Sequence, residues 1–445
     1  MLTTTSAWQT KNNAAAKMPI YAFQIQGQSS VYTTHDLTSL GVTNAPNYEP
    51  WLLTPQGASQ SIDVINGSSS IGDLQCEVID KGGAVRALVG QKRLQGSTVT
   101  LLVGYPGLDW VNDFVALHTY VLYKIVPTDG YTSFNFICRD QQLLLKKTIY
   151  THPENGFTLS TENPWLLCGT PAECFQAIAL FALGLPASSI DRPAMVDLDS
   201  PGEGIFAGLR PFLFQLTRSF EAKQFLETEI FKPSGLYCVV LNTGALSLRC
   251  MRPPAAGPSP VFTFTPDNTV VLPQFDAQPV INEALWEFDY DGSEYNNDET
   301  FLESTSISQY GRGNQFNVQS SGLQTPYGAF GFTEWVSARL FKRFSGVAPG
   351  IPGGATILNV RSMLMTLPVW VGDYVAITHD LMPDLTTGNL GVTDRIYEVV
   401  ERSPNYATGT MQYKLLDTGL TGQPAAYEWG VASARPFLVN QSPVY

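Results

Sequence analysis

The sequence predicts a mainly β, multidomain protein. The chain, at 445 residues, is longer than a domain with a single hydrophobic core usually is. At the typical ~150 residues per domain, this length suggests about three domains. Hydrophobic residues make up 44% of the chain, so it can form substantial cores, while charged residues make up only 15% against a usual ~25%. The 38 glycines and 30 prolines interrupt the chain too often for long helices, which favours strands joined by turns.

The first part of the chain divides into an arm and a β domain. Residues 1–18 are polar and alanine-rich without a clear period, so we expect an N-terminal arm that orders only against a partner, if at all. Residues 19–155 contain short apolar or alternating segments between turns, such as YAFQIQG, TVTLLVGYPGL and YTSFNFICRD. This pattern predicts a first β-barrel or sandwich domain.

Helical spacing dominates only in the next segment, residues 156–258, which we expect to form a small α+β domain. Thr170 is a suitable N-cap, Pro171 suits the first helical position, and Leu183-Gly184 suits the end of that helix. A second helix is expected in SFEAKQFLETEIFKPSG, and the following LYCVVLNTGALSLRC predicts a β-hairpin.

A proline-rich piece, MRPPAAGPSP at 251–260, marks the clearest linker, because consecutive prolines do not fit a central strand. Strand patterns return beyond it in ALWEFDYDG, ATILNVRSMLMTLPVWVGDYVAITHDL and DRIYEVVERSPNYATGTMQYKLLD. We therefore expect a second β-barrel domain with long loops over residues 259–435. The last residues, 436–445, resemble another arm.

Charge and hydropathy exclude two classes of partner. The net charge is −13 and basic pairs such as Lys146-Lys147 and Lys342-Arg343 are few, so a specific nucleic-acid surface is not expected. No apolar run reaches the ~18 residues that span a bilayer, and the N-terminus lacks the apolar core of a signal peptide. We expect a soluble protein made in a cytoplasm.

The usual catalytic patterns are missing, so we expect no enzyme. The four histidines show no paired-ligand spacing and are interpreted as surface or turn residues. The segment Gly67–Gly72, GSSSIG, misses the nucleophile-elbow spacing by one residue and is interpreted as a serine-rich turn. The acidic cluster FDYDGSEYNNDE at 288–299 lacks the calcium-loop spacing and is interpreted as a solvated loop. Asp289 and Asp291 in it stay open as a carboxylate pair of a hydrolase.

The cysteines give the only cofactor hypothesis. Six cysteines far apart in a chain without a secretion signal are first interpreted as buried thiols. Two of them bracket CGTPAEC at the predicted loop-to-helix junction, and others lie in the flanking strands, so an iron-sulfur cluster is a weak alternative. Its candidate ligands are Cys138, Cys168, Cys174, Cys238 and Cys250.

Several phrases, in their order, resemble tail-tip (baseplate) hub proteins of tailed bacteriophages and gene transfer agents. The first region contributes IYAFQIQG, YTTHDL, LQGSTVTLLVGYPGL and TSFNFICRDQQLLLKK. The second contributes NPWLLCGTPAECFQAIALFALGLPASSID and EAKQFLETEIFKPSGLYCVVLNTGALSLRCMRP. The third contributes LWEFDYDG, SISQYGRG, QSSGLQT and VWVGDYVAITHDLMPDLTTGNLGVTDRIYEVVERSPNYATG. The similarity runs from Pro19 onward.

The resemblance implies a structural virion protein at the tail tip that closes the tail tube and forms part of the DNA ejection channel. It implies a homotrimer, whose two barrel-like hub domains per chain give a pseudo-sixfold ring. It also implies distal tail, tail tube, tape measure and central fibre proteins as partners, and a role in host attachment. The relatives' iron-sulfur binding is not carried over beyond the weak cysteine hypothesis, and no peptidase motif is present.

Two other functions stay open. The chain could be a distal tail ring or a receptor- or carbohydrate-binding tail-tip protein. Exposed tryptophans would favour glycan binding, although tryptophans in β domains are more often part of the core. The available ones are Trp110, Trp165, Trp286, Trp335, Trp370 and Trp429.

Overall fold

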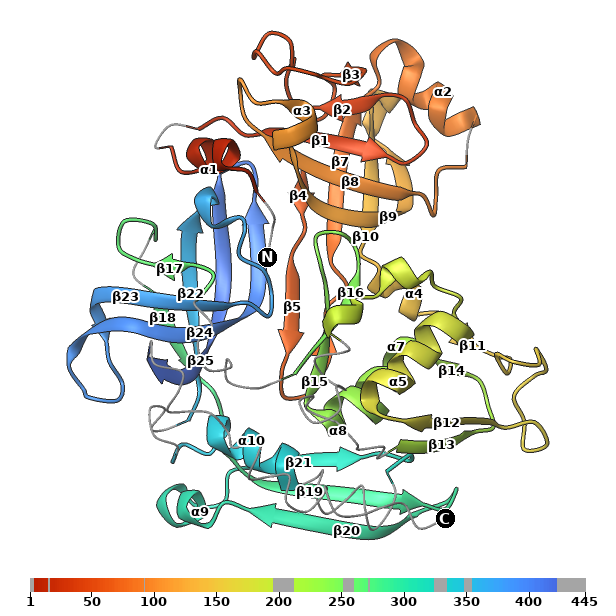
Figure 1. Ribbon diagram of the computed structural model, residues 1–445, viewed down its shortest axis with the longest axis vertical. Helices are drawn as coiled ribbons and strands as arrows, with labels where there is room; N and C mark the ends of the chain where they lie inside the picture. The colour runs from red at the N-terminus through yellow and green to blue at the C-terminus, as the bar shows by residue number, and fades with distance from the viewer. Residues whose placement is uncertain are drawn as a thin grey trace.

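The computed structural model describes residues 4–14, 17–91, 93–194, 212–250, 260–270, 273–323, 334–347 and 354–421. The protein is mainly β and multidomain, as predicted, with two eight-stranded sheets and several smaller ones (Figure 1). Residues 251–259 of the expected linker and the expected arm at 436–445 lie outside the described residues. No helix among the described residues combines the length and apolar character that crossing a membrane requires.

The first large sheet has the strand order β3-β2-β1-β8-β9-β10-β7-β4. Alternating burial along its central strands, such as in β7 and β8, places every second side chain in the core. The strands are β1 (Ile20–Ile25), β2 (Val31–Thr33), β3 (Tyr48–Glu49), β4 (Gln56–Gly57), β7 (Asp73–Ile79), β8 (Thr98–Gly104), β9 (Val115–Pro127) and β10 (Ser133–Arg139). Short helices on this sheet's loops are η1 (Lys81–Gly83), α2 (Ala84–Gln91), α3 (Trp110–Asp113), η2 (Asp129–Tyr131) and α4 (Gln142–Leu145).

The N-terminal segment differs from the prediction of an arm that needs a partner. Residues Ser6–Asn12 form α1, whose N-cap Thr5 accepts a hydrogen bond from the backbone of Trp8. Trp8 is fully buried against Tyr105, and the side chain of Asn12 donates to the carbonyl of Met365 over 3.0 Å. This helix is therefore ordered by its own chain, between the first sheet and the C-terminal part (Figure 1).

The α+β elements confirm the predicted helices and hairpin. Thr170 and Glu173 form a complete capping box at α5 (Pro171–Gln176), which continues as the π-helix η3 (Ala177–Ala182). The second predicted helix consists of α7 (Ala222–Phe225), the π-helix η5 (Leu226–Phe231) and α8 (Lys232–Ser234), and ends at left-handed Gly235. The hairpin follows as β15 (Leu236–Val240) and β16 (Leu246–Cys250).

Two short strand pairs complete this part of the chain. They are β11 (Thr148–Ile149) with β14 (Phe220–Glu221), and β12 (Trp165–Gly169) with β13 (Phe212–Leu216). A single 3-10 turn, η4 (Ala187–Ser189), precedes the residues that are not described.

The second large sheet follows the order β17-β23-β24-β25-β22-β18 and gains β5 and β6 from the N-terminal part of the chain. Gln60 and Ser61 of β5 pair with Arg402 and Glu401 of β24, so the chain passes directly from β4 of the first large sheet into the second. The elements are β5 (Gln60–Asp63), β6 (Ser68–Ser69), β17 (Thr263–Phe264), β18 (Gln274–Ala277), β22 (Thr356–Met363), η7 (Leu364–Thr366), β23 (Tyr374–Pro383), β24 (Leu390–Asn405) and β25 (Thr410–Thr421).

Part of the region expected as a second barrel with long loops forms its own three-stranded sheet, ordered β20-β19-β21. Its strands are β19 (Ile281–Tyr290), β20 (Tyr295–Leu302) and β21 (Asn314–Gln319), and its helices are α9 (Ser304–Tyr310) and α10 (Glu334–Phe344). The acidic segment interpreted as a loop is instead the β19–β20 hairpin, because Tyr290 pairs with Tyr295 across a tight turn. The strand pattern of ALWEFDYDG correctly predicted β19, whereas the polar residues of β20 gave no apolar alternation to predict its pairing partner.

A buried ionic contact ties three of these parts together. Glu398 of β24 is fully buried and accepts hydrogen bonds from the hydroxyl of Tyr237 in β15 and from the guanidinium of Arg343 in α10. The Arg343–Glu398 pair has a separation of 2.6 Å. A buried carboxylate is stable only with such partners, so β24, β15 and α10 are held in one relative position.

We predict that Glu398→Ala destabilises the protein by about 3–5 kcal/mol, because it leaves the Arg343 charge buried without its partner. Urea unfolding followed by tryptophan fluorescence measures the loss. Glu401→Ala on the same strand is the matched control, since its pair with Lys414 is partly exposed and contributes below about 1 kcal/mol. Equal effects of the two substitutions would contradict the structural role of Glu398.

Candidate functional site

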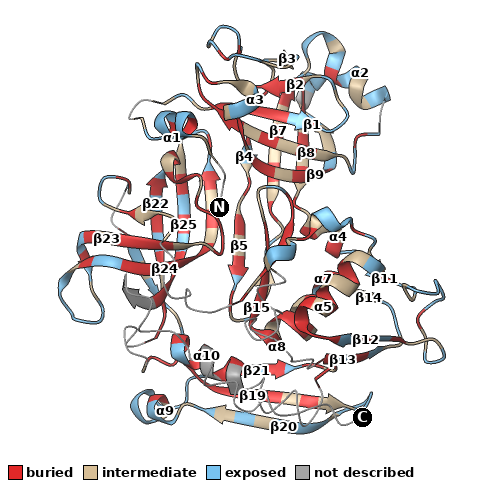
Figure 2. Ribbon diagram, viewed as in Figure 1, coloured by how far each residue is buried: buried red, intermediate tan, exposed pale blue. Residues whose placement is uncertain are grey.

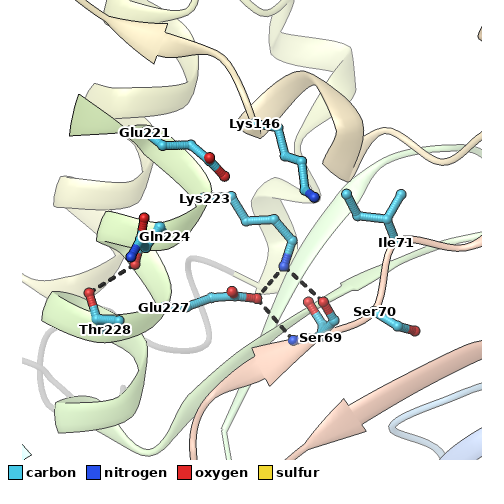
Figure 3. A pocket seen from close by; sticks show the side chains of 9 residues that line it. All are labelled: Ser69, Ser70, Ile71, Lys146, Glu221, Lys223, Gln224, Glu227 and Thr228. Carbon is cyan, nitrogen blue, oxygen red and sulfur yellow. Dashed lines mark hydrogen bonds and ion pairs between the residues drawn. The ribbon is translucent and has the colours of Figure 1, made fainter. Parts of the chain in front are cut away.

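An open pocket lies where the β5–β6 segment meets the helix formed by α7 and η5 (Figure 3). Its volume is about 440 Å³. Polar and charged side chains of both signs surround it, so it is not an apolar ligand cavity. The lining residues are Ser69, Ser70, Ile71, Lys146, Glu221, Lys223, Gln224, Glu227 and Thr228.

One wall of the pocket is a contact that we call the Ser69 clamp, made of Ser69, Lys223 and Glu227. Lys223 and Glu227 lie one helical turn apart and form an ion pair. The ammonium of Lys223 donates to the Ser69 carbonyl over 2.8 Å, and the Ser69 N–H donates to the Glu227 carboxylate over 2.9 Å (Figure 3). Both backbone polar groups of Ser69 are thus satisfied by charged side chains of the α+β part, as a neighbouring strand would satisfy them.

A second layer of hydrogen bonds supports the clamp. The hydroxyl of Ser69 donates to Gln142 over 2.6 Å, and the Gln142 amide donates to the Ser70 carbonyl over 3.1 Å. Asp140 in turn accepts from the backbone N–H groups of Gly72, over 2.6 Å, and Gln142, over 2.9 Å. The network connects the first sheet, the β6 strand and the α7–η5 helix.

Asp140 is buried, and this burial raises the pKa of its carboxyl to about 7. The hydrogen bonds from the Gly72 and Gln142 N–H groups and the charges of Lys223 and Arg139 oppose this shift but do not cancel it. Because the folded pKa is raised above the unfolded value of 3.8, the contribution of this group to stability is present in acid and is lost as the pH rises through about 7.

The GSSSIG segment has a larger structural role than the serine-rich turn that the sequence suggests. Gly67 has a φ of +66°, and a Cβ there would lie 2.7 Å from the backbone nitrogen of Lys232. A Cβ at Gly72 would lie 2.9 Å from the Asp140 carboxylate. The two glycines are required by close approach of other parts of the chain, and Ser69, the middle one of the three serines between them, is clamped.

A second joint lies around Trp370 in the C-terminal part. The guanidinium of Arg402 stacks 4.2 Å from the Trp370 ring centre, and the indole N–H of Trp370 donates to the Val240 carbonyl over 2.8 Å. His118 of the first sheet packs 5.2 Å from the same ring and lies 2.9 Å from the Tyr406 hydroxyl. The joint combines side chains and backbone of both large sheets and the β15–β16 hairpin.

His118 corrects the expectation that the histidines are surface or turn residues. It is 1% exposed, and burial, followed by the charge of Arg402, lowers the pKa of His118 well below its usual value. His379 is also buried, at 7% exposed, whereas His35 and His152 are partly exposed. A neutral imidazole enclosed by aromatic rings is a packing element here, and a sequence without its partners cannot show that.

The structure does not bring the candidate iron-sulfur ligands together. Among the described residues, no three His, Cys, Asp or Glu side chains are arranged to hold a metal ion. The five candidates occupy different elements, and only Cys168 is exposed. They are Cys138 in β10, Cys168 in β12, Cys174 in α5, Cys238 in β15 and Cys250 at the end of β16.

The two carboxylates considered for hydrolysis have structural roles in the β19–β20 hairpin. Asp291 accepts hydrogen bonds from the N–H groups of Ser293 and Glu294, which lower its pKa to about 2. Asp289 accepts from the Asn297 side chain over 2.9 Å. A hydrolase needs one carboxyl with a raised pKa to act as the acid, whereas the pKa of Asp291 is lowered.

The tryptophans proposed for glycan binding are mostly core residues where the structure describes them. Trp165, Trp286 and Trp370 are buried, and Trp110 is partly buried against Phe114. The side chain of Trp335 and the whole of Trp429 lie outside the described residues. The described tryptophans therefore form no exposed aromatic platform of the kind that sugars stack on.

Comparison with known proteins gives a structural likeness without a sequence match. No family model and no curated protein matches the chain. A tail protein from Neisseria meningitidis MC58 is similar at 9% identity and a TM-score of 0.49, over 90% of this chain and 97% of that chain. The 43 kDa tail protein of prophage MuSo2 from Shewanella oneidensis is similar at 11% identity and a TM-score of 0.47, over 90% and 99%.

A prophage tail protein from Listeria monocytogenes EGD-e is also similar, at 9% identity and a TM-score of 0.43, over 93% of this chain and 99% of that chain. All three of these structures are of tail proteins.

We predict that Lys223→Met destabilises the protein by about 1–3 kcal/mol, because the Ser69 carbonyl and the Glu227 carboxylate lose their charged donor. Urea unfolding measures the change. Lys146→Met, which lines the same pocket, is the control and is expected to stay within about 0.5 kcal/mol, since Lys146 is exposed. If the two substitutions change the unfolding free energy equally, the Ser69 clamp makes no specific contribution to stability.

We predict that Asp140 makes the protein less stable as the pH rises from about 4 to about 7. The unfolded carboxyl has already lost its proton in this window while the folded one retains it. Asp140→Asn removes this dependence, so the difference in unfolding free energy between wild type and variant changes across the window. Urea midpoints at several pH values test it, and parallel curves for the two proteins would show that Asp140 does not titrate there.

Proposed function

We propose that this chain is a non-enzymatic structural protein of a phage-like tail, acting as the tail-tip hub. In this role it closes the tail tube, connects it to distal tail and central fibre proteins, and lines part of the DNA ejection channel in the virion. The observation that carries the proposal is the direct passage of the chain from one large sheet to the other: β5, which follows the first sheet's β4 in the chain, pairs with β24 of the second. Two β modules are thereby fixed in one unit, as a pseudo-sixfold trimer requires.

Rigidity between the parts supports a connector. One continuous cluster of buried apolar side chains runs from Trp8 to Leu416 and includes residues of every part of the fold (Figure 2). The Ser69 clamp and the buried Glu398 contact add directional bonds between the same parts. Domains joined by small polar interfaces move relative to one another by default, whereas a continuous core with buried ion pairs resists such motion.

The proposal includes neither catalysis nor a cofactor. It rests on the structural roles of the carboxylates Asp289 and Asp291 and on the scattered positions of the cysteines. Its partners are further copies of the chain together with distal tail, tail tube, tape measure and fibre proteins. We keep the predicted domain ranges, 19–155, 156–258 and 259–435, as part of the proposal.

A distal tail ring is the alternative, and it differs in symmetry. We expect the purified chain to form a trimer, so its mass in solution should equal that of three chains of 48.7 kDa. Size-exclusion chromatography with light scattering measures this at micromolar concentration, and two-dimensional class averages show the symmetry. A stable six-chain ring would contradict the hub and favour the distal tail ring, and a monomer at every concentration would contradict both.

A further inference from the structure

We propose that the outer edge of β20 is a docking site for an extended, basic segment of another protein, which adds to the β20-β19-β21 sheet as a further strand. This inference does not depend on the hub proposal or on the trimer. It follows from the geometry of one strand, the charge around it and the side chains on its open face.

β20 is an unusually long edge strand. Among the described residues it has one strand neighbour, β19, and it spans eight residues. The two large sheets end in much shorter strands, namely β3, β4 and β17 of two residues and β18 of four. Figure 1 shows β20 on the outer side of the molecule, with β19 between it and the remaining parts. Natural edges are usually shortened or interrupted by proline or lysine, and β20 contains neither.

The hydrogen bonds of the hairpin show which backbone groups face outward. The N–H of Glu303 donates to the Asn282 carbonyl over 2.9 Å, so the odd-numbered residues of β20 bond to β19 in this register. On the far side of β19, the Ser320 N–H donates to the Glu287 carbonyl, in agreement with the same alternation. In the regular part of the ladder, away from the turn, the backbone groups that point away from β19 belong to Asp298, Thr300 and Leu302.

The charge around this edge selects the partner. The sequence from residue 253 to residue 311 contains no lysine or arginine. The hairpin and its flanks carry the acidic residues Glu287, Asp289, Asp291, Glu294, Asp298, Glu299 and Glu303. A second copy of β20 would bring like charges opposite each other and is repelled, whereas a strand with basic side chains is attracted.

The side chains of the outward residues specify the partner further. Asp298, Thr300 and Leu302 alternate with the residues bonded to β19, so they share one face, and all three are exposed. Leu302 is 49% exposed. A strand docked here places alternate side chains on the same face, so a basic residue suits the position beside Asp298 and an apolar residue the position beside Leu302.

The test uses the full-length chain and a fluorescent peptide of about eight residues, the length of β20, that alternates lysine and valine. A matched peptide carries glutamate in place of lysine. We expect the lysine peptide to bind at least about tenfold more tightly than the glutamate peptide, and to slow hydrogen exchange in residues 295–302. Fluorescence anisotropy gives the affinities, and mass spectrometry gives the exchange.

Two substitutions at one position separate edge pairing from simple charge attraction. Thr300→Pro removes an outward N–H without removing a bond to β19, and should weaken binding of the lysine peptide about tenfold or more. Thr300→Val keeps the N–H and should bind as the wild type does. Circular dichroism and melting temperature confirm that both variants are folded.

Three results would overturn the inference. They are equal binding of the two peptides, no binding of the lysine peptide at about 1 mM, and equal binding by the proline and valine variants. The last result, with strong salt dependence, would indicate a diffuse acidic surface without strand addition. None of these outcomes bears on the mass measurement that tests the trimeric hub.

Discussion

The structure depends on the requirement that the Glu398 carboxylate buried on β24 be satisfied by groups from other parts of the chain. This strand pairs with β23, β25 and β5, and it carries both Glu398 and Arg402 in fully buried positions. Glu398 is stabilised by Tyr237 and Arg343, while Arg402 stacks on Trp370 and donates to the Leu367 carbonyl. Because these partners come from separate parts of the chain, the strand can be buried only when those parts are in place.

The same requirement explains how the first sheet and the α+β part are joined. Ser69 lies at the end of a strand segment that has left the first sheet, and its backbone groups need partners. The Lys223–Glu227 pair supplies them from a helix instead of a strand. The protein thus behaves as one connected body of β modules, and within the described residues β20 is the longest of the edges at which its three main sheets end. A connector with an open edge is suited to holding neighbours without changing its own shape.

Local sequence signals predicted the elements that depend on neighbouring residues. The cap at Thr170, the stop at Gly235 and the β15–β16 hairpin follow from hydrogen bonds and backbone angles within a few positions. The sequence did not predict the long-range features, because they depend on residues that are far apart in the chain. The pattern around Trp8 is too short to show an amphipathic helix, and GSSSIG contains no sign that Lys223 and Glu227, far away in the sequence, will bond to Ser69. The one sequence signal for this helix was a possible N-cap, Thr5, three residues before Trp8.

The sequence by itself determined that the protein is mainly β and where its central helices begin and end. It also showed that the common catalytic motifs are missing. These properties arise from composition and from interactions over a few residues. Only the tertiary structure decided that β5 joins the second sheet, that His118 is buried and neutral beside Trp370, and that Asp289 and Asp291 support a hairpin. Strand pairing and burial depend on partners that may lie anywhere in the chain, so a side chain's role is fixed only when those partners meet.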